Sequence, residues 1–281
     1  MIILINSKTK LVGLIGHPVD HSFSPIMHNA AIKDLKINYR YFAFDVSEEN
    51  LKDVVAGAKA FNFRGFNITI PHKMNIMKYL DEIDCDAEAI GAVNTVKIEN
   101  GKAIGYNTDG IGVKKALEEK TGILINKNIL IIGSGGASRA VSFELAKDNN
   151  LTIVNRNIEK AENLSKEISR KLKKENPLNY GGLDINIENF DIIINTTPVG
   201  MYPHTEVEPV IPLNNIKKDA VVMDLIYNPL EPVFLKEAKK YGAKTINGIG
   251  MLVYQGAVSF EIWTGIKPDI FVMKKSIISK I

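Results

Sequence analysis

Residues 128–146, NILIIGSGGASRAVSFELA, combine a short apolar strand, a glycine turn and an amphipathic helix. Gly133 permits a tight turn after the strand, and Gly135 and Gly136 let backbone N–H groups approach a pyrophosphate at the helix N-terminus. Ser138 replaces the third glycine of the G-x-G-x-x-G pattern. The stretch predicts a dinucleotide-binding unit, and an ordinary strand–turn–helix junction is the alternative.

Segments with strand-like and helix-like patterns alternate on both sides of this unit, and Asn100-Gly101 predicts a hairpin turn. Such alternation is typical of α/β architecture with parallel sheets. We expect two α/β domains separated by a cleft, the second a Rossmann-like, doubly wound parallel sheet. Residues 108–247 are the expected nucleotide-binding Rossmann domain. Residues 1–107 together with 248–281 are the expected substrate-binding catalytic domain.

The strand that follows the glycine unit, Leu151–Val154, ends at Asn155 and Arg156 rather than at an acid. A fold that selects NAD places Asp or Glu there for the ribose 2′-OH, whereas cationic groups bind the 2′-phosphate of NADP. Lys160 adds a second base one turn later, and Arg is rare in this chain, with 5 Arg against 30 Lys. The pattern favours NADP, and a solvated surface charge at Arg156 is the alternative.

Composition excludes several classes of partner. Lys+Arg 35 against Asp+Glu 32 is too balanced for a nucleic-acid binder, and no segment approaches the roughly 20 apolar residues that span a bilayer. Cys85 is the only cysteine, so no intramolecular disulfide can form, which fits a cytoplasmic location. His17, His21 and His28 lie close in sequence, but prolines separate them and no carboxylate or thiolate cluster accompanies them, so no metal site is expected.

Four polar clusters each close a strand-like segment, where α/β proteins bind ligands. They are HSFSP (21–25), NITIPHK (67–73), GAVNT (91–95) and GYNTDG (105–110). The apolar residues after Pro71 have helical spacing, which puts Lys73 in the first turn of a predicted helix, where unpaired N–H groups disfavour a cation. Either Lys73 is a solvated charge or a site needs an ammonium group there. Ser24 and Asp109 have an ordinary alternative of their own, as helix caps.

The motifs GHPVDHSFSPIMHN, FNITIPHK, IGAVNT, GYNTDG, GSGGASRA, NTTPVGM, DLIYNP and GMLVYQGA occur together and in this order. In this combination the chain closely resembles the shikimate dehydrogenase family over nearly its whole length. The resemblance implies NADP-dependent interconversion of 3-dehydroshikimate and shikimate, a step toward chorismate and the aromatic amino acids. A broader quinate/shikimate dehydrogenase and a non-catalytic, NADP-sensing regulatory domain are the alternatives, and assembly as a homodimer is left open.

The resemblance also implies roles for the residues at matching positions. Lys73 and Asp109 match the catalytic lysine and its aspartate partner. The matching substrate contacts are the carboxylate-binding Ser22 and Ser24 and the ring-hydroxyl contacts Asn67, Thr69, Asn94 and Gln255, with Tyr227 close by. The matching cofactor contacts are the phosphate loop Gly133, Gly135, Gly136 and Ala137, the 2′-phosphate clamp Asn155, Arg156 and Lys160, and Thr196, Gly248 and Met251 near the nicotinamide and its ribose. Asn157 stands where the clamp usually carries Thr.

Overall fold

The computed structural model describes residues 5–280 and divides into two compact units. The first unit extends to Thr108 and resumes at Leu252, and the second comprises Asp109–Met251. Residues 248–251 belong to the second unit, whereas the expected boundary placed them in the first. Helix α8 (Ile249–Thr264) therefore begins in the second unit and continues into the first.

The first unit contains a six-stranded sheet in the order β2-β1-β3-β5-β6-β4. Strand β1 pairs in parallel with β2 and β3, β5 pairs antiparallel with β3 and β6, and β4 pairs in parallel with β6, so this sheet is mixed. Asn100 and Gly101 join β5 to β6 with positive φ angles of 52° and 75°, which confirms the hairpin, and a two-residue turn can connect only antiparallel strands. The strands are β1 (Lys10–Gly16), β2 (Tyr39–Asp45), β3 (Gly65–Ile68), β4 (Glu82–Ile83), β5 (Thr95–Glu99) and β6 (Lys102–Tyr106).

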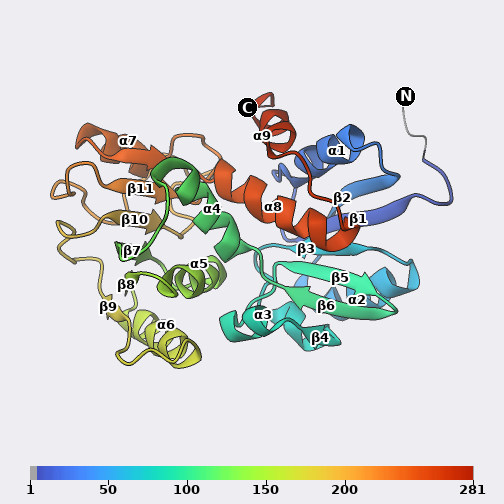
Figure 1. The fold of residues 1–281 in the computed structure, drawn as a ribbon, viewed down its shortest axis with the longest axis horizontal. Helices are drawn as coiled ribbons and strands as arrows, with labels where there is room; N and C mark the ends of the chain where they lie inside the picture. The colour runs from blue at the N-terminus through green and yellow to red at the C-terminus, as the bar shows by residue number, and fades with distance from the viewer. Residues whose placement is uncertain (1–4, 281) are drawn as a thin grey trace. The chain divides into compact units, whose positions relative to one another are not determined.

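The helices of the first unit include two that come from opposite ends of the chain and lie side by side, α1 and α9 (Figure 1). This contact brings the last described residues back to the N-terminal sheet. The helices are α1 (Ser24–Asp34), η1 (Glu48–Asn50), α2 (Leu51–Ala60), η2 (Asn75–Tyr79), α3 (Cys85–Ile90), most of α8, and α9 (Ile270–Ile278).

The α-helix predicted after Pro71 is wrong. Residues 70–74 form turns, the short 3₁₀-helix η2 follows, and Ile83 lies in strand β4, which pairs with β6. The apolar residues that suggested a helix pack instead into the core around Phe66 and Val96. Pairing with a strand that lies nearby in space overrides the helical spacing of a short apolar segment.

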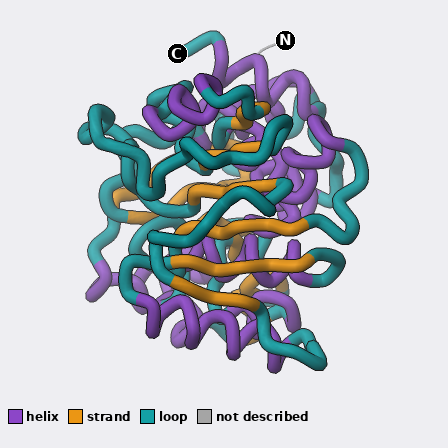
Figure 2. Tube along the Cα trace, turned by 90° about the vertical axis from the view of Figure 1, so that its left-hand side faces the viewer, coloured by secondary structure: helices purple, strands orange, loops and turns teal. Residues whose placement is uncertain are grey.

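The second unit contains six strands, all parallel, in the order β12-β11-β10-β7-β8-β9 (Figure 2). With β7 as the first strand of this unit, this is the strand order of Rossmann folds, so the predicted doubly wound sheet is confirmed. The central strands are apolar along their length because helices cover both faces of such a sheet. The strands are β7 (Asn128–Ile132), β8 (Asn150–Val154), β9 (Asn179–Gly181), β10 (Ile192–Asn195), β11 (Val221–Asp224) and β12 (Lys244–Ile246).

Helices α4 and α5 pack closely within the second unit. A Cβ on Gly110 would lie 2.5 Å from the carbonyl oxygen of Ala140, so the close approach of the two helices requires glycine at that position. The helices of this unit, besides the start of α8, are α4 (Asp109–Thr121), α5 (Gly136–Ala146), α6 (Ile158–Lys171) and α7 (Val233–Lys240).

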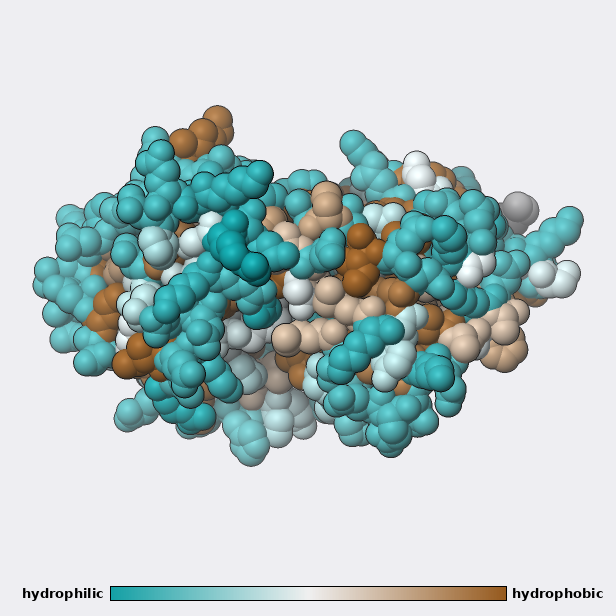
Figure 3. Space-filling model, turned by 90° about the horizontal axis from the view of Figure 1, so that it is seen from below, coloured by the Kyte–Doolittle hydropathy of each residue, from teal (hydrophilic) through white to brown (hydrophobic). Residues whose placement is uncertain are grey.

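The face drawn in Figure 3 is mostly hydrophilic, with hydrophobic residues among the hydrophilic ones. Among residues 5–280, no helix combines the length and the apolar character needed to cross a membrane.

Candidate active site

The polar cluster after β1 places two serines at the start of α1. Ser24 is 5% exposed and is the first residue of the helix, so it is not the N-cap, which is Phe23. The backbone N–H of Ser24 donates to Oγ of Ser22 over 3.2 Å. The two hydroxyls therefore lie together at a helix N-terminus, a good position for a carboxylate.

Asn67 lies on β3, and its amide is held from both sides. The Tyr41 hydroxyl donates to Oδ1 of Asn67 over 2.8 Å. Nδ2 of Asn67 donates to Oγ of Ser259 over 3.0 Å, although Ser259 lies 192 residues later in the chain. Thr69 follows β3 and is half-buried, with its backbone N–H donating to the Ile15 carbonyl oxygen. The structure thus fixes the Asn67 amide between a phenol from β2 and a hydroxyl from α8.

Asn94 and Gln255 meet in the same unit. Nδ2 of Asn94 donates to Oε1 of Gln255 over 3.4 Å and to Oγ1 of Thr108 over 2.9 Å. The backbone N–H of Thr108 donates in return to Oδ1 of Asn94 over 2.8 Å. Because a backbone N–H can only donate, this bond fixes which end of the Asn94 amide carries the oxygen.

Lys73 and Asp109 occupy different local settings from those predicted. Lys73 lies in the turn before η2, is half-buried, and accepts a hydrogen bond at its carbonyl oxygen from the backbone N–H of Val93. The unfavourable helix position expected for its ammonium group is therefore absent. Asp109 is 3% exposed and begins α4, and the bonds between Thr108 and Asn94 anchor the residue just before it.

The glycine turn after β7 has the geometry of a phosphate loop. Gly133 has φ +113°, and a Cβ there would lie 2.7 Å from Oγ1 of Thr196. Nothing lies within 4 Å of a Cβ placed on Gly135, so a ligand has room to approach this backbone, and Gly136 and Ala137 form the first turn of α5. Ser138, the departure from the glycine pattern, donates from Oγ to the Gly133 carbonyl oxygen over 2.7 Å and so supports the turn.

The residues after β8 present two cations at the start of α6. Arg156 and Lys160 are exposed, and neither has a side-chain hydrogen bond or ion pair with another residue in the range 5–280. Nδ2 of Asn155 donates to the Asn157 carbonyl oxygen over 3.0 Å. Asn157 caps α6 by accepting the Lys160 N–H at 3.2 Å, which gives the Thr-to-Asn departure a structural role.

The ends of β10 and β11 carry a buried polar group that the sequence reasoning missed. Asp224 is fully buried, accepts from Nδ2 of Asn195 over 3.1 Å and from the Ile226 N–H over 2.9 Å, and burial raises its pKa to about 7. Asn195 directly precedes Thr196, whose hydroxyl donates to the Ile132 carbonyl oxygen over 2.6 Å. The Asn195–Asp224 pair thus fixes the strand ends beside the glycine turn.

Three further candidates follow β11. A Cβ on Gly248 would lie 2.0 Å from the Leu225 carbonyl oxygen, so only glycine fits there. Met251 is buried in the first turns of α8. Tyr227 is half-buried, and burial raises the pKa of its phenol.

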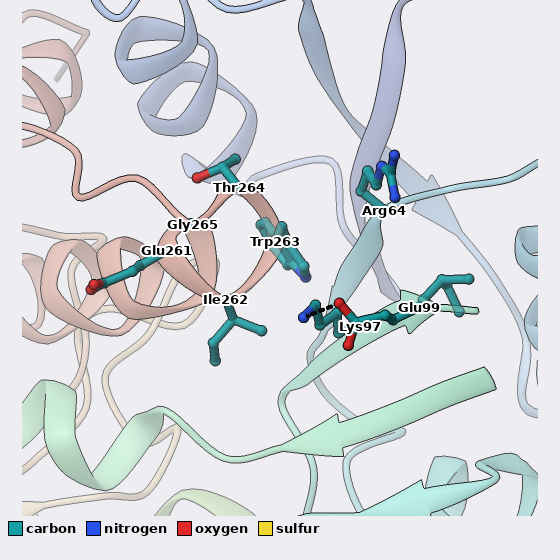
Figure 4. Close-up of a pocket in the computed structure, with 9 residues that line it drawn as sticks. Arg64, Lys97, Glu99, Glu261, Ile262, Trp263, Thr264 and Gly265 are labelled. Carbon is teal, nitrogen blue, oxygen red and sulfur yellow. Dashed lines mark ion pairs between the residues drawn. The ribbon is translucent and has the colours of Figure 1, made fainter. Parts of the chain in front are cut away.

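The first unit contains a cavity of about 380 Å³. It is lined by side chains of mixed charge, including Lys97 and Glu99, which form an ion pair at 2.6 Å (Figure 4). None of the predicted site residues lines it, so it is not the candidate active site.

The histidines of the N-terminal cluster have separate environments. His17 pairs with Asp45 at 2.5 Å, and that carboxylate raises the pKa of the imidazole, while His28 is buried among aromatic rings. Within the described range, no group of three or more His, Cys, Asp or Glu side chains could hold a metal ion.

Four residues of the buried polar network were not predicted as site residues: Tyr41, Thr95, Thr108 and Ser259. Thr95 and Thr108 belong to the clusters GAVNT and GYNTDG, so the pattern contained them without singling them out. Ser259 follows Gln255 by four residues, a spacing that places both on one helix face. Tyr41 has no local signal, because the partner of its hydroxyl, Asn67, is 26 residues away.

Comparison with protein families identifies three consecutive segments of the chain. Residues 14–96 match the shikimate dehydrogenase substrate-binding domain, residues 115–227 match shikimate/quinate 5-dehydrogenase, and residues 248–278 match the shikimate 5-dehydrogenase C-terminal domain. A shikimate dehydrogenase (NADP⁺) of Methanococcus maripaludis is 81% identical over 278 residues, which cover 99% of each chain.

Solved structures agree with this match. A shikimate dehydrogenase in complex with NADP⁺ is 65% identical and superimposes with a TM-score of 0.97, covering 99% of this chain and 98% of the other. The Thermus thermophilus enzyme in complex with NADP(H) and shikimate is 34% identical, with a TM-score of 0.88 and coverage of 97% and 100%. The chain therefore belongs to the family of NADP-dependent shikimate dehydrogenases.

Proposed function

We propose that this chain catalyses the reversible reduction of 3-dehydroshikimate to shikimate with NADPH. The observation that carries the assignment is the buried network in the first unit, which joins Asn67, Asn94 and Gln255. Amide groups can bind the ring hydroxyls of a hydroxylated ring acid, and the hydroxyls of Ser22 and Ser24 at the start of α1 can bind its carboxylate. Family membership points to the same substrate class.

The second unit is the proposed NADP-binding unit. The open backbone at Gly135 fits a pyrophosphate at the N-terminus of α5. Arg156 and Lys160 fit a 2′-phosphate, because both are exposed cations without a partner among residues 5–280. When bound, the cofactor supplies the hydride. Thr196, Gly248 and Met251 are the proposed contacts near its nicotinamide and ribose.

Lys73 and Asp109 are the proposed catalytic residues. Hydride addition to a ketone builds negative charge on its oxygen, so a nearby donor lowers the barrier. The Lys73 ammonium carries three N–H donors and a positive charge, and can transfer a proton to that oxygen. Asp109 would orient the ammonium and accept a hydrogen bond from a neighbouring substrate hydroxyl. In the oxidative direction the same two groups take the proton back.

Ser22 and Ser24 are the proposed contacts of the substrate carboxylate, away from the reacting carbon. Asn67, Thr69, Asn94 and Gln255 are proposed to bind the ring hydroxyls, with Tyr227 close by. The single cysteine, Cys85, is exposed and unpaired, which supports a cytoplasmic enzyme.

A spectrophotometric assay of NADP⁺ reduction tests the assignment. Shikimate should be oxidised with NADP⁺ at a rate that far exceeds the rate with NAD⁺. Quinate is the control substrate, because one matching family is described as acting on shikimate and quinate. Equal turnover of quinate would identify the broader enzyme, and no turnover of either acid would favour the regulatory alternative.

A further inference from the structure

Tyr41 contacts a residue that is proposed to bind the substrate. Its ring is 2% exposed on β2, and its hydroxyl donates to Oδ1 of Asn67 over 2.8 Å. The Asn67 oxygen can only accept, so the single phenol proton goes to Asn67. One buried hydroxyl therefore fixes one side of a proposed ring-hydroxyl contact.

The other side of the Asn67 amide is fixed by three acceptors. The two N–H groups of Nδ2 are shared among Oγ of Ser259 at 3.0 Å, Oγ1 of Thr95 at 3.1 Å and the Asn94 carbonyl oxygen at 3.2 Å. The carbonyl can only accept, so the nitrogen must face that side and the oxygen must face Tyr41. The amide is left with one oxygen lone pair for a ligand, which makes Asn67 an acceptor for a substrate hydroxyl.

Tyr41 is itself held rigidly. Asn29 accepts the Tyr41 backbone N–H at 3.1 Å and donates to its carbonyl oxygen over 2.8 Å, so one amide clamps the backbone of this residue. The ring stacks on His28, with centroids 4.3 Å apart. A side chain fixed at backbone and ring can impose its geometry on the groups that it contacts.

We propose that Tyr41 and Ser259 are positioning residues that hold the Asn67 amide in one fixed orientation for the ring acid, Tyr41 at its oxygen and Ser259 at its nitrogen. The inference rests on the proposed function, since Asn67 acts there as a substrate contact. Tyr41 and Ser259 act only through this residue.

The first test is Tyr41→Phe, which removes one hydroxyl and keeps the ring stacked on His28. The KM for shikimate should rise by roughly tenfold, the effect of losing one buried hydrogen bond. The KM for NADP⁺ should stay at the wild-type value, and kcat should fall by less than about threefold, since no reacting group is touched. Tyr39→Phe is the matched control: Tyr39 is 8% exposed, lies on the same strand with the same side-chain direction, and has no bond to the network.

The second test measures whether Tyr41 acts through Asn67. The effects of Tyr41→Phe and Asn67→Ala on kcat/KM should be non-additive, because the second change removes the group that the Tyr41 hydroxyl holds. The effects of Tyr39→Phe and Asn67→Ala should be additive. An unchanged KM in Tyr41→Phe, additive effects of Tyr41→Phe and Asn67→Ala, or an equal loss in kcat and in both KM values would overturn the proposal.

If Tyr41→Phe does not fold, Ser259→Ala carries the test, because it removes the acceptor on the opposite side of Asn67. It should also raise the KM for shikimate with little change in kcat. Ser142→Ala is its control, since Ser142 is fully buried and its hydroxyl has no hydrogen-bond partner. Kinetics of the wild-type chain distinguish failure of this inference from failure of the proposed function. If the wild-type chain oxidises shikimate and the variants keep its KM values, only the positioning role is refuted. If the wild-type chain does not oxidise shikimate, the proposed function is refuted.

Discussion

The imidazole of His28 stacks on the phenol ring of Tyr41, with centroids 4.3 Å apart and ring planes 6° apart. Neither ring nitrogen of His28 has a hydrogen-bond partner within the described residues, and the side chain is fully buried. Burial without a partner disfavours the charged form and lowers its pKa to about 3. The residue behaves as part of an aromatic core and not as a metal ligand.

His28 should make the first unit less stable in acid. The unfolded chain binds a proton at His28 below about pH 6.5, while the folded chain does so only near pH 3, so the free energy of unfolding should increase between these values as pH rises. The full difference is on the order of 5 kcal/mol. His28→Phe should remove this slope. Fluorescence of Trp263, the only tryptophan, whose ring lies 5.5 Å from His28, reports the urea unfolding of this unit. An unaltered slope in the variant would contradict the prediction.

Asp224 should have the opposite effect in the second unit. Its pKa in the folded chain is about 7, against about 3.9 when unfolded, so the folded state binds the extra proton between these values. The free energy of unfolding of this unit should therefore decrease as pH rises from about 4 to 7, by on the order of 4 kcal/mol. Asp224→Asn should flatten this decrease, as measured by urea unfolding followed by circular dichroism at several pH values. A variant that keeps the decrease would show that another group titrates.

Replacement of Lys73 or Asp109 should affect turnover more than substrate binding. Lys73→Ala and Asp109→Asn should each lower kcat by at least the roughly 10²-fold typical of losing a general acid or base. Steady-state assays with shikimate and NADP⁺ measure this loss. Lys78→Ala, a change at an exposed lysine on η2, is the control. Near-normal kcat in Lys73→Ala would remove this lysine from the proposed chemistry.

Arg156 should determine the preference for NADP. Arg156→Ala should raise the KM for NADP⁺ by roughly tenfold or more, because a charge-assisted bond to the 2′-phosphate is lost. The KM for NAD⁺, which lacks this phosphate, should not rise. Arg170→Ala is the matched control, since Arg170 is an exposed cation at the other end of α6. An equal rise in the KM for both cofactors would show that Arg156 does not recognise the 2′-phosphate specifically.

Much of the second unit was predictable because its signals are local. The apolar strand before Gly133 and the helix after Gly136 follow from period and turn chemistry within a single stretch of 19 residues. The first unit was less predictable. The segment after Pro71 has helical spacing, yet β4 forms there because β6, a neighbour in space, offers a pairing edge. Short elements such as α3 and β9 lack enough residues to show a period.

The residues of the candidate site also differ in how far a local pattern predicts them. Arg156 and the phosphate-loop glycines follow from local pattern, whereas the family resemblance was needed to assign a role to Asn67. Thr95 and Thr108 belong to the polar clusters GAVNT and GYNTDG, but the sequence pattern does not indicate that they join the buried hydrogen-bond network. Asp224 was not predicted, because the sequence does not distinguish a buried acid at the end of a strand from a solvent-exposed one.

By itself, the sequence determined the α/β class, the nucleotide-binding stretch, the preference for a phosphorylated cofactor and the set of polar residues available to a ring acid. Only the tertiary structure decided that Ser259 and Tyr41 flank one amide and that the buried network is shared by strands β2, β3 and β5 and helix α8. The physical reason is that strand and helix periods depend on neighbours a few residues apart. Hydrogen bonds between residues as distant in sequence as Asn67 and Ser259 exist only once the sheet and the returning helix have packed together.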